Sequence, residues 1–130
     1  MKEIQSYSLL PALNRTATAT GTGVDLQPTI NIMGRNMKAI LNVGAVVSSA
    51  SPEDATLDVT IEESDALGSG YAAISGAAFT QVTSAIGAVH EEIHFIQTKR
   101  YIRAVGTQAG TGDEVDYCVL VAGVLRLSQA

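Results

Sequence analysis

The stretch Leu57-Asp58-Val59-Thr60-Ile61-Glu62 alternates apolar and polar side chains without interruption. In an extended chain successive side chains point to opposite faces, so Leu57, Val59 and Ile61 share one face and the polar residues share the other. Such alternation is typical of a strand with one buried and one solvated face. This stretch therefore predicts a β-sheet that covers a core on one side.

Two regions upstream also have extended character. Residues 37–47 are apolar on both faces apart from two polar side chains, which predicts a central strand covered on both sides. Residues 48–54 include a proline and are interpreted as a loop. Nearer the N-terminus, residues 7–13 and 14–22 predict a first pair of extended segments.

Downstream, turn signals separate the remaining segments. Residues 64–84 are rich in Gly, Ala and Ser, and we expect loops there with a short strand near residues 78–82. Two longer strands are predicted at residues 101–108 and 115–127. Gly110-Thr111-Gly112-Asp113 lies between them and supplies the permissive residues that a hairpin turn requires.

Frequent turn signals and little helical periodicity place the chain in the all-β class. We predict an antiparallel β-sandwich, jelly-roll-like in arrangement. With 130 residues the chain is long enough for one core, and residues 14–130 are assigned to a single sandwich domain. Residues 1–13 are either an N-terminal arm or a first strand. Because Trp is absent and Phe and Tyr are few, small aliphatic side chains must fill the core.

Composition argues against several partners. Charged residues make up 16% of the sequence and the formal net charge is −5, which opposes direct binding of nucleic acid. Neither a signal peptide nor a membrane span is evident, so we expect a cytoplasm-like compartment and no membrane contact. The single cysteine, Cys118, permits no internal disulfide and is expected to be a buried, inert thiol. The scarcity of aromatic rings leaves little surface for stacking on sugars.

His90-Glu91-Glu92-Ile93-His94 matches the H-E-x-x-H pattern, so a zinc hydrolase is the enzymatic alternative. On a helix the two histidines could share one ion, with Glu91 as general base and Glu114 as a third ligand. On a strand the same spacing separates their Cα atoms by about 13 Å, too far for a shared zinc. The alternation here favours the strand. We therefore predict no metal site, no catalytic residue and no cofactor.

The acidic run Glu62-Glu63-Ser64-Asp65 offers hard oxygen ligands of the kind that calcium prefers. It lacks the spaced Asp/Asn-Gly loop of a calcium site, and we interpret it as the solvated end of a strand. The sequence around Ser75 likewise lacks the flanking glycines of a nucleophile elbow.

Two sequence pieces carry a resemblance to a known class of proteins. The first is residues 57–65, which end in Glu-Ser-Asp, and the second is Lys99-Arg100-Tyr101-Ile102-Arg103. With the Gly-Ser-Gly-Tyr segment between them and the closing apolar strand, they resemble small virion proteins of tailed bacteriophages. The resemblance covers about the last three-fifths of the chain, and the sequence departs from the pattern at residues 71–74.

The resemblance implies a β-sandwich decoration or cement protein that forms a homotrimer on the outer capsid surface, with the major capsid protein as its partner. A tail or head-tail connector subunit is the alternative within the virion. Such a protein would be made in the host cytoplasm. The low charged fraction agrees with a surface that other subunits cover, and several simultaneous contacts would give avidity.

The apolar N-terminal segment supplies four candidate contact residues, Tyr7, Leu9, Leu10 and Leu13. As an arm, this segment would add to a neighbouring sheet edge or pack on a capsid subunit. As a first strand it would belong to the chain's own sheet. The sequence leaves both interpretations open.

Overall fold

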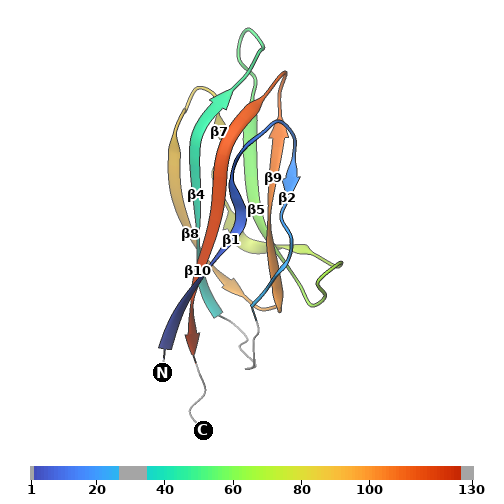
Figure 1. The fold of residues 1–130 in the computed structure, drawn as a ribbon, viewed down its shortest axis with the longest axis vertical. Helices are drawn as coiled ribbons and strands as arrows, with labels where there is room; N and C mark the ends of the chain where they lie inside the picture. Colours follow the sequence, from blue (N-terminus) through green and yellow to red (C-terminus); the bar gives the residue numbers. More distant parts are fainter. Residues whose placement is uncertain (1, 27–34, 127–130) are drawn as a thin grey trace.

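The chain folds into two antiparallel sheets that pack face to face (Figure 1). The structure, a computed structural model, describes residues 2–26 and 35–126. Regular structure in these residues consists of strands alone, and none of them lies in a helix long and apolar enough to cross a membrane. The strands are β1 (Lys2–Arg15), β2 (Ala19–Thr20), β3 (Val24–Asp25), β4 (Arg35–Val47), β5 (Thr56–Ser64), β6 (Ala72–Ala78), β7 (Val82–Thr83), β8 (Val89–Gln97), β9 (Tyr101–Ala109) and β10 (Glu114–Arg126).

The order of the strands is that of a jelly roll. The four-stranded sheet has the order β1-β10-β4-β8. The six-stranded sheet has the order β2-β9-β5-β6, with β3 also paired to β9 and β7 to β5. Along the chain, consecutive principal strands alternate between the sheets except for β5 and β6, which pair with each other. The predicted all-β, jelly-roll-like antiparallel sandwich is therefore confirmed.

The alternating stretch at residues 57–62 forms most of β5 and directs its apolar side chains into the core. Leu57, Val59 and Ile61 are buried, whereas the residues between them are partly exposed. Inward-facing residues of the four-stranded sheet, such as Leu41 and Val119, belong to the same core. Each such aliphatic side chain contributes about 1.5–3 kcal/mol when fully buried.

The predicted hairpin of the last two strands is wrong, because these strands lie in different sheets. β9 belongs to the six-stranded sheet and β10 to the four-stranded sheet, so residues 110–113 form an arch and not a hairpin turn. The glycines of this arch are still required, since Gly110 and Gly112 have φ angles of 126° and 58°. Of the two extended segments predicted near the N-terminus, residues 7–13 lie in β1, and residues 14–22 include the end of β1 and β2, which belongs to the other sheet. Alternation reveals a buried face but does not identify the partner strand.

β4 and β6 differ from expectation in position or environment. β4 is central in its sheet, between β10 and β8, as predicted. Its outer face is not covered by the described part of the chain, because Lys38, Ile40 and Asn42 remain partly exposed. The strand expected near residues 78–82 lies earlier, as β6, and residues 82–83 form β7. Ala, Gly and Ser dominate β6, and these residues have no strong strand preference.

The N-terminal segment is the first strand of the sandwich. β1 pairs with β10 from Lys2 opposite Arg126 to Arg15 opposite Val115. Register shifts follow Ser8 and again follow Leu10. For the described part of residues 1–13, the structure therefore shows a strand of the chain's own sheet and not a separate arm.

The β4–β5 loop and the β9–β10 arch lie at the end of the sandwich away from the start of β1 and the end of β10 (Figure 1), and Asp54 joins them. Its carboxylate accepts hydrogen bonds from the backbone N–H of Thr111 at 2.9 Å, from the Thr111 hydroxyl at 3.1 Å and from the Ser48 hydroxyl at 2.9 Å. These bonds, the Thr111 N–H first among them, lower the pKa of Asp54. The β4–β5 loop and the β9–β10 arch are thus held to each other.

Tyr117 spans the space between the two sheets. It is 2% exposed and points from β10 toward Gly106 of β9. A Cβ atom at Gly106 would lie 2.8 Å from Cζ of Tyr117 and closer still to its hydroxyl oxygen. Burial raises the pKa of Tyr117, which keeps the hydroxyl neutral. Glycine at position 106 therefore makes room for the ring.

The contact predicts that Gly106→Ala destabilises the fold by about 1–3 kcal/mol, because the added methyl group overpacks the interior. Gly44→Ala is the matched control, since its Cβ would be 3.7 Å from Cβ of Asp116, an ordinary contact. Urea denaturation followed by circular dichroism measures both. Equal free energies of unfolding for the two variants would show that Tyr117 does not constrain position 106.

Candidate functional site

The two histidines of the H-E-x-x-H pattern lie on strand β8, as the alternation predicted. His90 is paired with Asn42 of β4 and His94 with Lys38 of β4. Four residues of strand cover about 13 Å, so the imidazoles cannot share a zinc ion at bonding distance. In the described part of the chain, no group of three or more His, Cys, Asp or Glu side chains is placed to hold a metal ion.

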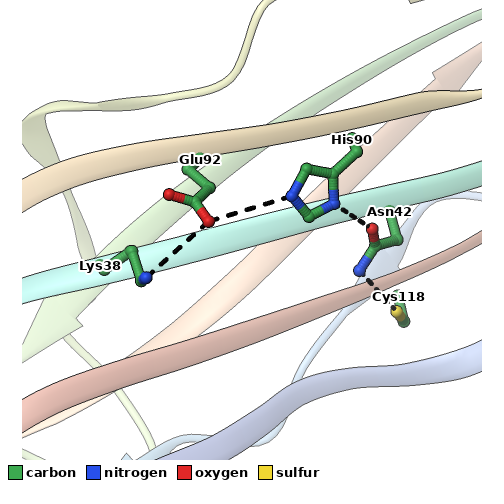
Figure 2. Close-up of polar contacts among 5 residues, drawn as sticks. All are labelled: Lys38, Asn42, His90, Glu92 and Cys118. Carbon is green, nitrogen blue, oxygen red and sulfur yellow. Dashed lines mark hydrogen bonds and ion pairs between the residues drawn. The ribbon is translucent and has the colours of Figure 1, made fainter.

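His90 instead takes part in a row of polar contacts across the outer face of the four-stranded sheet (Figure 2). Glu92 Oε1 lies 3.8 Å from Nζ of Lys38 and 3.9 Å from Nε2 of His90. His90 Nδ1 is 2.6 Å from Oδ1 of Asn42, and Asn42 Nδ2 is 3.9 Å from Sγ of Cys118. The row thus runs from β8 over β4 to β10.

The order of groups in this row does not suit thiol chemistry. A catalytic cysteine needs a base within hydrogen-bond reach of its sulfur. Here Asn42 stands between His90 and Cys118, and the amide donates to the sulfur while its oxygen faces the imidazole. Because an amide cannot take up the thiol proton, His90 has no direct route to Cys118. Cys118 itself is partly exposed, and so less buried than predicted.

The two sequence pieces that carry the phage resemblance meet at one place in the fold. Glu62 pairs with Arg103 across β5 and β9, and Ser64 pairs with Tyr101. Arg103 Nε donates to Glu62 Oε1 at 2.7 Å, and the two side chains are only 28% and 21% exposed. A partly buried, charge-assisted bond of this kind is stronger than one in open solvent.

Glu63 and Ser64 hold the turns next to this pair. The Glu63 carboxylate accepts hydrogen bonds from the backbone N–H and hydroxyl of Thr98, at 2.9 and 2.8 Å, and from the N–H of Lys99 at 3.2 Å. The buried Ser64 hydroxyl donates to the carbonyl of Ser69 and accepts from the N–H of Ala66. The acidic run therefore fixes the β8–β9 turn and the β5–β6 loop. The carboxylates of its two glutamates already accept hydrogen bonds from other residues of the chain.

Tyr71 completes this cluster. The Arg103 guanidinium lies 4.0 Å from the centre of the Tyr71 ring, a cation–π contact. The Tyr71 hydroxyl donates to the Leu67 carbonyl at 2.8 Å, and burial raises the pKa of Tyr71. A Cβ atom at Gly23 would lie 3.1 Å from Cζ of Tyr71, so glycine is needed there as well. The β5–β6 loop is thereby pressed onto the six-stranded sheet.

The four candidate contact residues of β1 do not share one surface. Leu9 and Leu10 are 3% and 4% exposed and fill the core, so the prediction that they form a contact surface is not met in the folded chain. Tyr7 is partly buried against the core. Leu13, at 57% exposure, is the one large apolar side chain of the four on the surface. The register shift after Ser8 allows the two adjacent leucines to be buried together.

The outer face of the four-stranded sheet also carries exposed apolar side chains beside the polar row, Leu120 and Ile96 among them. Leu120 lies between Ser8 of β1 and Ile40 of β4. Two grooves open on this sheet, one of about 520 Å³ lined in part by Ile96 and one of about 360 Å³ lined in part by Leu13. Apolar side chains thus alternate with ionisable ones such as Lys38 and Glu92, a mixture that suits contact with another protein.

No family model matches this sequence, and no curated protein matches it. Two solved structures share the fold. The crystal structure of the SPBc2 prophage-derived protein YomS gives a TM-score of 0.52 over 96% of each chain, at 13% identity. The structure of infectious bursal disease virus Gx strain gives a TM-score of 0.55 over 97% of this chain and 32% of that chain, at 10% identity. The present chain thus spans about a third of the latter.

The strand geometry of β8 predicts that the purified, untagged chain holds no stoichiometric zinc and that His90→Ala and His94→Ala have the same metal content as the unchanged protein. Inductively coupled plasma mass spectrometry measures this directly. One zinc per chain that disappears in either variant would restore the hydrolase alternative.

The two arginines of the Lys-Arg-Tyr-Ile-Arg segment provide a matched pair for a stability test. Arg103→Met removes a partly buried bond and a ring contact, and we expect it to lower the free energy of unfolding by about 1–2 kcal/mol. Arg100→Met removes a pair with Asp25 and a ring contact with Tyr101 at 5.0 Å, but the side chains of the pair are 47% and 43% exposed, so we expect a smaller loss than for Arg103→Met. Thermal and urea unfolding compare them, and an equal or larger loss for Arg100→Met would contradict the prediction.

Proposed function

We propose that this chain is a structural virion protein of a tailed bacteriophage, and specifically a decoration or cement protein that binds the outer surface of the assembled capsid. The observation that carries the proposal is the contact between the two sequence pieces that resemble such proteins. Glu62 and Arg103 join them across β5 and β9, and their neighbours hold the adjoining turns. The resemblance therefore concerns residues that maintain one particular jelly roll.

The fold supports the same class. Jelly rolls are frequent among viral capsid proteins. The two similar solved structures are titled as a prophage-derived protein and a virus. Their low identity limits this support to the architecture, and the sequence pieces add the specificity to tailed phages.

The outer face of the four-stranded sheet is the proposed contact with the major capsid protein. Its central strand β4 was expected to be covered on both sides, yet Ile40 remains partly exposed in the single chain. Leu120 beside it is 38% exposed. A capsid subunit packed on this face would bury both side chains and supply the missing cover.

Direct contact with the genome is not part of the proposal. The chain has a net charge of −5. Its one basic segment is largely neutralised, because Arg100 is paired with Asp25 and Arg103 with Glu62. A phosphate backbone would therefore meet repulsion overall.

The proposed assembly is a homotrimer without enzymatic activity. A trimer that touches several capsid subunits must lose all its contacts before it dissociates, so modest contacts suffice. The candidate catalytic groups support a non-enzymatic role, since the imidazoles of β8 are separated along the strand and Asn42 shields Cys118 from His90.

Electron microscopy of particles with and without the protein tests the location. We expect trimeric density on the outside of the capsid, and an earlier thermal release of DNA from particles that lack it. Leu120→Glu places a charge on the proposed contact face and should reduce occupancy at least tenfold. Thr20→Glu, an exposed position on β2 of the other sheet, is the control and should bind normally.

Density confined to the tail would assign the chain to a tail or connector subunit. Capsid density with unchanged DNA release would remove the cementing role but keep the decoration role. Equal binding of Leu120→Glu and Thr20→Glu would place the capsid contact on another face.

A further inference from the structure

The longest uncharged part of the sequence forms one edge of the sandwich. Every Lys, Arg, Asp, Glu and His of the chain lies outside residues 66–89. Within this segment β6 and β7 both pair with β5 and form the outer edge of the six-stranded sheet. We call this surface the uncharged edge and define it by the exposed residues Ala72, Ala73, Ser75, Ala78, Ala85 and Ile86.

The other described edges carry the features that natural proteins use to prevent edge contacts. β8 has four ionisable side chains, β1 has Pro11 and two register shifts, and β2 and β3 are two residues long each. Charged side chains, proline, irregularity and shortness all oppose association at a sheet edge. The uncharged edge shares the irregularity in β6 and the shortness in β7, but it has neither charge nor proline, and Ile86 at its end is 55% exposed.

We infer that the uncharged edge is the surface through which copies of this chain meet around a rotation axis, an inference that rests on the homotrimer of the proposed function. Close to such an axis each residue faces its own copy, so any charge there meets a like charge. A different partner could match charges of opposite sign and would need no neutral strip. For a chain of net charge −5, a long neutral edge is therefore best suited to a second copy of itself.

Side-chain packing, and not a continuous backbone ladder, would make this contact. The pairing of β5 with β6 shifts register between Thr60 and Glu62, and Gly76 has a φ angle of 78°, so the edge is bent. Alanine and serine side chains allow close approach along it. The charged Glu91 of the adjacent β8 is bonded within the chain. Its carboxylate accepts hydrogen bonds from the N–H of Thr80 at 3.0 Å and from the Thr80 hydroxyl at 3.1 Å.

Sedimentation velocity of the purified full chain, with light scattering, tests the inference. The unchanged protein should have about three times the mass of one 13.5 kDa chain, and Ser75→Glu should reduce it to that of one chain. Thr20→Glu introduces the same charge on the opposite edge and should leave the mass unchanged. Circular dichroism checks that each variant is folded.

A cysteine probe covers the case in which Ser75→Glu does not fold. Ser75→Cys in a Cys118→Ser background should form disulfide-linked dimers under mild oxidation at least tenfold faster than Thr20→Cys in the same background. Equal rates, a monomeric unchanged protein, or a Ser75→Glu variant that folds and keeps its mass would each overturn the inference.

Particle binding separates this inference from the proposed function. If Ser75→Glu becomes monomeric and the unchanged protein does not bind capsids, the copy-to-copy contact stands and the decoration role fails. If Ser75→Glu keeps its mass but no longer binds capsids, the uncharged edge contacts the capsid, and the inference is wrong while the proposed function stands.

Discussion

Burial of one apolar face from each sheet against the other is the constraint on which the other features depend. Two such sheets are stable only when these faces meet, and side-chain sizes must then match across the gap. Tyr117 reaches from β10 to β9, where Gly106 leaves space for its ring. Tyr71 and Gly23 repeat this arrangement where the β5–β6 loop closes on its sheet. The interior therefore determines where glycine is required.

The existence of strands could be predicted from the sequence, whereas their partnership could not. Alternation in β5 identified a buried face correctly, but the same signal in β9 and β10 did not reveal that they lie in opposite sheets. A regular strand buries only every second residue, so nothing in the sequence indicated that Leu9 and Leu10 are both buried. Their burial depends on a register shift. The contact of Glu62 with Arg103 likewise depends on the pairing of β5 with β9, which long-range packing sets.

The distribution of charge links the framework to the proposed role. Several ionisable side chains form hydrogen bonds within the chain. Glu62, Glu63 and Asp54 each accept hydrogen bonds that hold a turn or a loop in place. The edge formed by β6 and β7 carries no charge, whereas the outer face of the four-stranded sheet combines apolar side chains such as Leu120 with the row of Lys38, Glu92 and His90. One protein can therefore offer two chemically different surfaces to two kinds of neighbour.

The pairing of β1 with β10 also bears on how the chain is made. Residues 2–15 pair with residues 115–126, so β1 leaves the ribosome long before its partner strand β10 has been synthesised. Most of the remaining pairs also join strands that are distant in sequence, a topology typical of slow folding. The four-stranded sheet therefore cannot be completed until β10 has been synthesised, and until then its apolar strands are exposed to aggregation or to chaperones.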